Sequence, residues 1–350
     1  MPLPKIFLTG ASGYVGGDVL HALLTTHPDW EPSTTILLRN RSYEAAFRSA
    51  YPDINIFFAS NDDTAAITAE VAKHELILHF ALSADHLPSA AAIVAGLKSR
   101  GGGVYIHTSG TDVLLDPIAK LHATTEVRVF DDWEGIGEVT SLPDEAPHRP
   151  VDRFVLSSSS DTLKTAIICP STIYGTGRGV ISQRSDQIPN LAKLILQQRK
   201  GLQLADGKTF WNCVHVYDLS RLYVRFIEGA IITSSSTSGI SDSGLTWNEE
   251  GYYLVESGTY FWGDISRRIT REAYKLGLVE GEEVTVVDME RRELLAPAGR
   301  PVINYAVAAK AIRARKLLDW VPVEGSLEDE IPAIVRAQAR ALGLWDTPSE

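Results

Sequence analysis

The chain has 350 residues, enough for one large core or two smaller ones, and its 44% hydrophobic and 22% charged residues are ordinary for a soluble globular protein. Its net charge of -11 argues against nucleic acid or an anionic membrane as a partner, because both attract positive surfaces. Cys169 and Cys213 provide neither a disulfide framework nor a zinc-ligand spacing, and the sequence has no secretory leader and no long apolar run. We therefore expect a cytoplasmic protein of two coupled domains that acts on a small molecule and binds no metal.

Residues 5–17 predict a strand, a glycine-rich turn and the start of a helix. Gly10, Gly13 and Gly16 lie where a tight turn, an approaching phosphate and close helix packing each exclude a side chain. The start of the helix adds free N–H groups and the positive end of a dipole. The pattern indicates a dinucleotide pyrophosphate site that also includes Ser12, Tyr14 and Val15, and the alternative is an ordinary glycine turn.

The order Thr9-Gly10-x-x-Gly13-x-x-Gly16 resembles the signature of the extended short-chain dehydrogenases/reductases, which include nicotinamide-dependent epimerases, dehydratases and reductases. The resemblance implies a nicotinamide cofactor. Residues 34–39 form the second predicted strand, which ends at Arg39. An arginine at this end pairs with the 2′-phosphate of NADP, whereas an acid would bind the ribose of NAD. Arg39 therefore favours NADP over NAD, and the alternative is that Arg39 and Arg41 are solvated loop charges.

Further predicted strands at residues 54–59, 75–81 and 104–111 alternate with helical segments, including one at 88–100. Such alternation predicts an α/β fold with a doubly wound parallel sheet of the Rossmann type, whose ligands gather at the carboxyl ends of its strands. The resemblance implies that two segments border the cofactor. Ser60 and Asn61 lie on the adenine side, where the family often has an acid in place of this serine. Phe80, Ala81 and Leu82 form the strand end beside the phosphates and ribose.

Beyond the fifth strand, residues 112–150 predict a long surface excursion, which we interpret as a lid. A shortened helix is expected in 151–165 and a strand at 166–168. The following loop resembles the family's nicotinamide-contacting segment, which implies roles for Pro170, Thr172 and Ile173, and residues 210–219 match another family block. We expect a loop at 231–245, a strand at 251–255, and helices at 262–276, 300–320 and 327–342. The predicted dinucleotide-binding domain comprises residues 1–174 and 211–259, and the smaller, mostly helical substrate domain comprises 175–210 and 260–350.

The family's catalytic Tyr-x-x-x-Lys pair is missing, since no tyrosine in this chain has a lysine four residues later. In the corresponding helix His148 and Asp152 have the tyrosine–lysine separation, and a histidine is a competent acid or base near neutral pH. His148 is therefore the candidate proton-transfer residue. The alternative is that His148 precedes the helix and Asp152 satisfies a first-turn N–H group. Ser109 and Thr111 are candidates to donate a hydrogen bond to a substrate oxygen.

These observations favour an NADP-dependent oxidoreductase or epimerase with an atypical proton donor. The missing pair also motivates a second hypothesis, a non-catalytic sensor that binds NADP(H) and regulates a partner. The nicotinamide loop argues against the sensor, because recognition of the adenine half alone would not need it. By analogy with the family, a homodimer is an open expectation.

Overall fold

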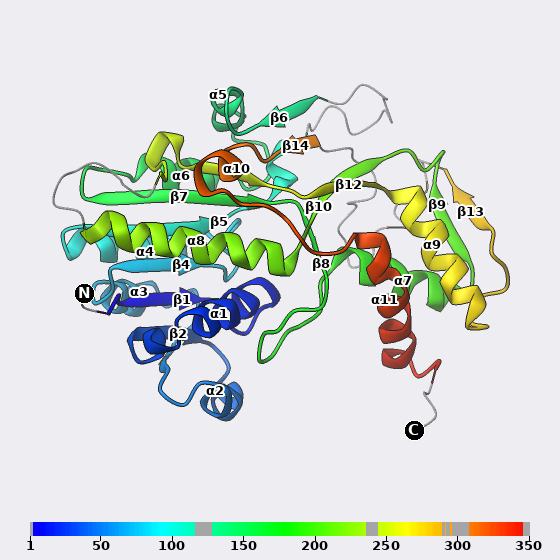
Figure 1. Cartoon of the computed structure of the whole chain (residues 1–350), viewed down its shortest axis with the longest axis horizontal. Helices are drawn as coiled ribbons and strands as arrows, with labels where there is room; N and C mark the ends of the chain where they lie inside the picture. The colour runs from blue at the N-terminus through cyan, green and yellow to red at the C-terminus, as the bar shows by residue number, and fades with distance from the viewer. Residues whose placement is uncertain are drawn as a thin grey trace.

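A seven-stranded parallel sheet forms the centre of the larger part of the molecule (Figure 1). The computed structural model describes residues 3–115, 128–235, 244–288, 291, 295 and 308–345. The strand order is β11-β7-β5-β4-β1-β2-β3, so the side of the sheet to which successive strands are added switches between β1 and β4. Its strands are β1 (Ile6–Thr9), β2 (Thr34–Leu38), β3 (Asn55–Phe58), β4 (Leu76–His79), β5 (Gly103–Thr108), β7 (Leu163–Pro170) and β11 (Tyr252–Val255). The predicted doubly wound sheet is confirmed, and its carboxyl edge at this switch is where such folds bind ligands.

Alternate side chains of the strands pack into two separate cores, because successive residues of a strand face opposite sides of the sheet. Phe7, Ile77 and Tyr105 share one core with α3, α4 and α6. Leu8 and Ile106 share the other with α1, α2 and α8. The helix bounds are α1 (Tyr14–Thr26), α2 (Glu44–Ala50), α3 (Thr64–Val71), α4 (Leu87–Ser99), α6 (Arg149–Ser157) and α8 (Val216–Ser235). Polar residues on the first of these faces are therefore buried between sheet and helices.

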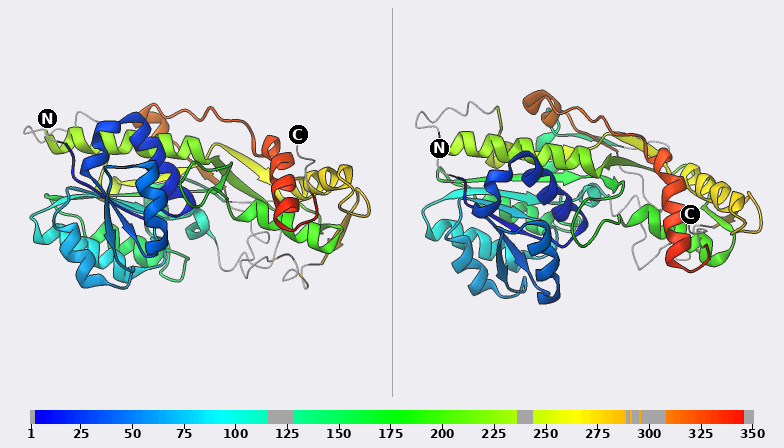
Figure 2. Two further views of the ribbon diagram at one scale, coloured as in Figure 1. Left: turned by 90° about the horizontal axis from the view of Figure 1, so that it is seen from below. Right: turned by 60° about the horizontal axis from the view of Figure 1, so that its bottom comes forward.

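A smaller part lies beside the sheet and is built from three mutually packed helices and short strands (Figures 1 and 2). The helices are α7 (Gln187–Gln198), α9 (Trp262–Lys275) and α11 (Leu327–Ala341), and the parallel pair β9 (Gly201–Leu204) and β13 (Val284–Val287) packs on them. A three-stranded sheet of β8 (Thr172–Tyr174), β10 (Phe210–His215) and β12 (Gly258–Phe261) connects the two parts. Among the helices described, none is long and apolar enough to cross a membrane.

Several predicted segments differ from the observed elements. The excursion at 112–150 contains a 3-10 turn, η3 (Thr111–Leu114), strand β6 (Val129–Asp131) and helix α5 (Ile136–Thr140), while residues 116–127 lie outside the described range. The loop expected at 231–245 was wrong at its start, because α8 continues to Ser235; residues 236–243 lie outside the described range. The helix expected at 300–320 was also wrong in part, because β14 (Ala308–Lys310) pairs with β6 before the short helix α10 (Arg313–Leu318), and 300–307 are not described.

A buried carboxylate explains why residues 308–318 lie on the large sheet and not with the helical part. Asp132 accepts hydrogen bonds from the backbone N–H groups of Leu254, Ile312 and Arg313, at 3.0, 2.7 and 2.9 Å. These bonds tie the excursion and the α10 segment to the outer strand β11. Such non-local contacts are invisible in the local sequence pattern. The domain division predicted from the sequence stays a prediction, although α10 packs against β11 and α8.

Candidate active site at the carboxyl edge of the sheet

The turn between β1 and α1 is shaped by close contacts that only glycine permits at two positions. Gly10 has φ of +80°, and a Cβ placed there would lie 2.9 Å from the backbone nitrogen of Ala81. A Cβ on Gly16 would lie 2.5 Å from the carbonyl oxygen of Gly10. Gly13 differs, because a Cβ there would meet only that same oxygen, at 3.2 Å. A side chain at Gly13 would therefore project into the space in front of the turn.

No side chain caps the start of helix α1. Gly13 is the N-cap residue and provides no side-chain cap, and the first turn contains no acidic residue. Helix α11, by contrast, has a capping box formed by Ser326 and Asp329 and three acids in its first turn. The uncapped start of α1 fits an anionic group such as a pyrophosphate, which would accept from these N–H groups. The residues present thus fit a dinucleotide.

Two side chains hold the segment after β4 in place beside this turn. The hydroxyl of Thr9 accepts hydrogen bonds from the backbone N–H groups of Phe80 and Ala81, both at 3.2 Å. The amide nitrogen of Asn61 donates to the carbonyl oxygen of Ala81 at 3.0 Å. Leu82, which follows, has φ of +52° and is 67% exposed. The structure therefore brings the predicted segment 80–82 to the same edge as Gly10.

Arg39 and Arg41 lie at the end of β2, both exposed, on the side where the sequence places the adenosine. The guanidinium of Arg41 stacks over the ring of Phe58, 4.2 Å from its centroid. Ser60 is engaged locally, since its backbone N–H donates to the carboxylate of Asp63 at 2.7 Å. Among the described ion pairs none involves Arg39.

A loop after β8 is held to helix α1 by an ion pair between the buried Asp18 and the partly exposed Arg178. The carboxylate of Asp18 accepts from the backbone N–H of Arg178 at 2.7 Å, from its guanidinium at 2.7 and 3.1 Å, and from the hydroxyl of Ser220 at 2.6 Å. The guanidinium also lies over the ring of Tyr217, at 3.9 Å. Burial alone would raise the pKa of Asp18, but the hydrogen bonds from Arg178 and Ser220 hold it below its usual value.

Tyr14, a predicted cofactor residue, also holds this loop, because its hydroxyl donates to the carbonyl oxygen of Gly175 at 2.6 Å. The predicted nicotinamide segment lies at the start of the loop, with Pro170 ending β7 and Ile173 in β8. The hydroxyl of Thr172 is buried and lies 2.5 Å from the Gln187 side-chain oxygen and 3.0 Å from the Tyr260 hydroxyl. Thr172 thus has partners within the protein.

Beyond the end of β5, the hydroxyl of Ser109 does not point freely toward a substrate. It donates to Oδ2 of Asp152 at 2.9 Å, and the same oxygen accepts from the hydroxyl of Tyr252 at 2.7 Å. The Asp152 side chain is fully buried. Burial raises the pKa of Asp152 to about 6, although the two hydroxyl donors and the nearby His148 act in the opposite direction. Asp152, which the sequence paired with His148 by spacing and alternatively assigned to a first-turn N–H group, is therefore a buried carboxyl that accepts a hydrogen bond from a candidate catalytic serine.

His148 is the N-cap residue of α6, four residues before Asp152, and is oriented by an acid. Its Nδ1 is 2.6 Å from a carboxylate oxygen of Asp85, and a Cβ on Gly110 would lie 3.4 Å from its Nε2. Burial alone would lower the pKa of His148, but Asp85, with Asp112 and Asp152, raises it above its usual value. A proton on Nδ1 shared with Asp85 leaves Nε2 as the exchanging nitrogen. Thr111, the third candidate, is buried at the start of η3, beside Gly110.

A chain of buried polar side chains continues from Asp152 beneath the sheet. His107 Nε2 faces Asp152 Oδ1 at 3.7 Å, and its Nδ1 is 3.0 Å from the Tyr105 hydroxyl. That hydroxyl is 2.8 Å from Nδ1 of His79, whose Nε2 is 3.1 Å from the hydroxyl of Ser89. His107 is not among the candidates named from the sequence. The signal was present, because Tyr105 and His107 are spaced two apart on an otherwise apolar strand and therefore share one face.

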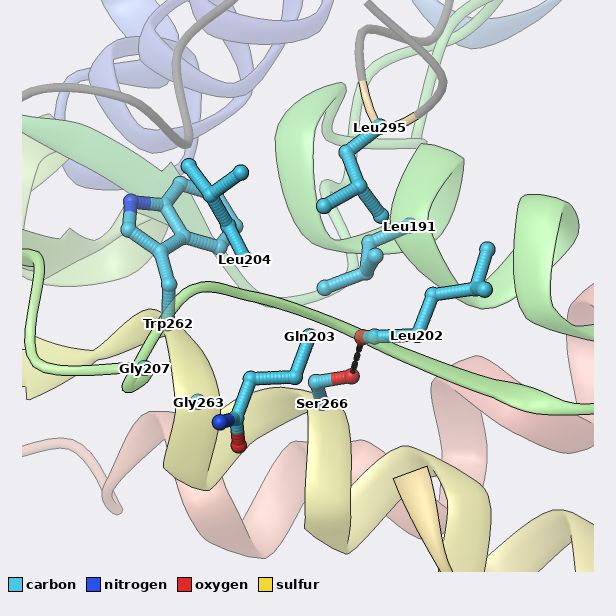
Figure 3. Close-up of a pocket in the computed structure, with 9 residues that line it drawn as sticks. All are labelled: Leu191, Leu202, Gln203, Leu204, Gly207, Trp262, Gly263, Ser266 and Leu295. Carbon is cyan, nitrogen blue, oxygen red and sulfur yellow. Dashed lines mark hydrogen bonds between the residues drawn. The ribbon is translucent and has the colours of Figure 1, made fainter. Parts of the chain in front are cut away.

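A small pocket lies in the helical part, between α7, β9 and α9 (Figure 3). Leucines and Trp262 line most of it, and the hydroxyl of Ser266 donates to the carbonyl oxygen of Leu202 at its floor. The described residues include no group of three or more His, Cys, Asp or Glu side chains that could hold a metal ion.

Comparison with known proteins identifies a relative over nearly the whole chain. Oxidase ucsJ from Acremonium sp is 33% identical over 348 residues, which cover 97% of this chain and 99% of that protein. The chain belongs to the family of this oxidase. Among solved structures, the dTDP-glucose 4,6-dehydratase DesIV from Streptomyces venezuelae, with NAD bound, has a TM-score of 0.66 at 16% identity, covering 97% of this chain and 98% of DesIV.

UDP-glucose 4-epimerase from Thermotoga maritima, with UDP-glucose, has a TM-score of 0.64 at 14% identity, covering 96% of this chain and 99% of the epimerase. The fold is therefore that of the extended short-chain dehydrogenases/reductases of epimerase/dehydratase type, as the glycine spacing predicted. No family model matches the sequence. The assignments of individual site residues stay predictions.

Proposed function

We propose that this protein is an NADP(H)-dependent oxidoreductase that interconverts an alcohol and a carbonyl group in a small organic substrate. One observation carries the proposal: the open, uncapped start of α1 lies at the same sheet edge as an Asp85-oriented His148 and the Ser109 hydroxyl. The relative's name, oxidase, favours oxidation–reduction over epimerisation. NAD in the DesIV structure supports a nicotinamide cofactor, and Arg39 supports the phosphorylated form.

In this proposal the bound nicotinamide accepts or donates the hydride, and the chain's own residues bind, orient and move the proton. The N–H groups at the start of α1 bind the pyrophosphate, and Arg39 pairs with the 2′-phosphate. Ser109 and Thr111 orient the substrate oxygen. In the oxidation direction His148 Nε2 would take the proton of the substrate hydroxyl, and in the reduction direction it would return a proton to the carbonyl oxygen.

The direct test is titration of the purified protein with NADPH and NADH by calorimetry, followed by a turnover panel of alcohols, carbonyl compounds and sugar nucleotides. We expect tight NADPH binding and cofactor-linked turnover of a member of the panel. Tight NADPH binding without turnover of any of these compounds would favour the alternative function, a non-catalytic NADP(H) sensor. The observation that supports the sensor is the hydrogen bond from the Ser109 hydroxyl to Asp152.

The cofactor preference makes a separate prediction. Arg39→Asp should weaken NADPH binding about ten- to a hundredfold while changing NADH binding little, because a charge-assisted contact worth about 1.5–3 kcal/mol is replaced by a like charge. Arg48→Asp, in the exposed helix α2, is the matched control and should change neither affinity. Equal affinity of the unmodified protein for the two nucleotides would contradict the NADP assignment.

A further inference from the structure

The Ser109 hydroxyl has one proton, and the buried Asp152 carboxyl decides where that proton points. With Asp152 ionised, Oδ2 can only accept, so the Ser109 hydroxyl donates to it, as observed at 2.9 Å. The Ser109 hydroxyl can then only accept a hydrogen bond from a substrate, through the lone pairs of its oxygen. If Asp152 instead carries a proton on Oδ2, that proton can be donated to Ser109, and the serine hydroxyl is released to donate elsewhere.

We propose that Asp152 is a positioning residue that sets the direction of the Ser109 hydroxyl. As a carboxylate it makes Ser109 accept a hydrogen bond from a substrate hydroxyl, and as a carboxylic acid it makes Ser109 donate to a substrate carbonyl oxygen. The site thereby matches the alcohol in one charge state and the carbonyl compound in the other. The inference rests on the proposed function, because it concerns the same substrate oxygen. Asp152 would be an additional residue of that site, with no counterpart in the Tyr-x-x-x-Lys pair.

The surroundings of Asp152 permit both charge states. Two hydroxyls, from Ser109 on the sheet edge and Tyr252 on β11, stabilise the carboxylate at Oδ2, while complete burial favours the acid. These opposing effects leave its pKa at about 6, within reach of physiological pH. The other titratable or charged groups facing it are His107 on β5, Cys169 on β7, and His148 and Arg149 on its own helix.

The row of buried polar side chains beneath the sheet, from His107 to Ser89, can accommodate either charge state of Asp152. In the described structure His107 Nε2 and Asp152 Oδ1 are both buried without a hydrogen-bond partner and face each other at 3.7 Å. If His107 is protonated on Nε2, it presents an N–H to the carboxylate, and its bare Nδ1 accepts from Tyr105. His79 then donates from Nδ1 to Tyr105 and accepts from Ser89 at Nε2.

The opposite order of donors is also complete. His107 then donates from Nδ1 to Tyr105, Tyr105 donates to His79, and His79 donates from Nε2 to Ser89. The Ser89 hydroxyl donates in turn to the backbone carbonyl of His86, at 2.9 Å. Burial holds the pKa of His79 at about 3 and that of His107 well below its usual value, so neither imidazole competes with Asp152 for its proton. In both orders the hydrogen bonds that join His107 Nδ1, Tyr105, His79 and Ser89 are kept, so this row of side chains accommodates either charge state of Asp152.

The first test uses the protein without cofactor or substrate, by infrared difference spectroscopy between about pH 4 and about pH 8. We expect a carboxylic acid C=O band that disappears with a midpoint near 6 and is missing in Asp152→Asn. Asp132, the other buried carboxyl whose pKa is raised to about 6, serves as the internal control, and its band should persist in that variant. Tyr252→Phe, a conservative change, removes a donor to the carboxylate and should raise the Asp152 midpoint by about one unit.

The second test measures KM against pH for the alcohol and carbonyl pair identified by the turnover panel. We expect the KM of the alcohol to rise as pH falls through the Asp152 midpoint and the KM of the carbonyl compound to rise as pH increases through it. Ser109→Ala should remove both dependences, and Tyr252→Phe should move them upward together with the infrared midpoint. Asp152→Asn, whose amide can donate to Ser109, should hold the carbonyl KM at its low-pH value.

The outcomes separate two kinds of failure. No Asp152-dependent infrared band, or KM profiles that Ser109→Ala leaves unchanged, would overturn the positioning role even if turnover is normal. No NADPH-linked turnover at all would defeat the proposed function and the positioning role with it. A band that depends on Asp152, shifts in Tyr252→Phe and coincides with the KM midpoints would support the proposal.

Discussion

Gly13 lies in the turn between β1 and α1, where an added side chain would occupy the proposed pyrophosphate site and make few contacts with the protein. Its backbone has φ of -83°, which any residue adopts, and a Cβ there meets only the Gly10 carbonyl oxygen. We predict that Gly13→Val abolishes nucleotide binding while leaving the thermal unfolding temperature within a few degrees. Gly16→Val is the contrasting variant, because its Cβ would collide with Gly10, and it should lose stability as well. Normal NADPH binding by Gly13→Val would mean that the turn is purely structural.

His148 is the residue on which the proposed proton transfer depends. We predict that His148→Ala lowers turnover about 10²- to 10⁴-fold and changes NADPH affinity only a few-fold, since a positioned acid or base contributes about that factor. In the oxidation direction kcat/KM should fall as pH drops through the pKa of His148, because the protonated imidazole cannot accept the substrate proton. Asp85 raises that pKa, so Asp85→Asn should move the fall to lower pH. Full turnover by His148→Ala would assign the proton to another group.

At the scale of elements, the contact between α1 and the loop after β8 depends on one buried carboxylate. Asp18 is fully buried and Arg178 is partly exposed, and removing one partner of such a pair leaves the other without compensation. We predict that Asp18→Asn lowers the free energy of unfolding by about 3 kcal/mol at neutral pH, measured by urea titration. Lys73→Ala, which breaks an exposed ion pair with Glu70, should cost less than about 1 kcal/mol.

The same pair gives a pH dependence of defined sign. The pKa of Asp18 is lower in the folded protein than its usual value. Its stabilisation is therefore complete above the unfolded value of about 4 and is lost as pH falls through the lower folded pKa. The difference between the unmodified protein and Asp18→Asn should shrink on acidification below about pH 4. A constant difference down to about pH 2 would contradict the assigned ion pair.

The sequence predicted the elements whose signal is local. The apolar runs at β1, β2, β4 and β5 and the glycine turn required no knowledge of the rest of the chain, and the resemblance in 169–175 pointed to β8. The strand β14 was missed because its three residues are held by pairing with β6, about 180 positions earlier, and by the Asp132 hydrogen bonds that follow. Partners that lie far apart in sequence leave no periodic signal.

The candidate site, like the fold, was predicted from the sequence only where its residues belong to a local pattern. His148, Ser109 and the glycine turn were identified from spacing and resemblance. Asp85 and Tyr252, which determine the orientation of His148 and the state of Asp152, belong to other elements and have no motif. Asp152 itself was named only as the partner of His148 in spacing, because a first-turn acid is ordinarily a surface residue and its burial depends on how α6 packs against β7.

At the scale of the whole molecule, the proposal requires that the strand ends, the α1 turn and the start of α6 converge on one nicotinamide ring. The most direct test is a crystal structure of the protein with NADPH. We predict that the pyrophosphate lies on the start of α1 beside Gly13, that the 2′-phosphate contacts Arg39, and that the nicotinamide C4 lies beside a substrate-sized space bordered by Ser109 and His148, with a reacting atom there about 3–4 Å from each. NADPH bound elsewhere, or a nicotinamide ring directed away from Ser109 and His148, would contradict the proposed active site.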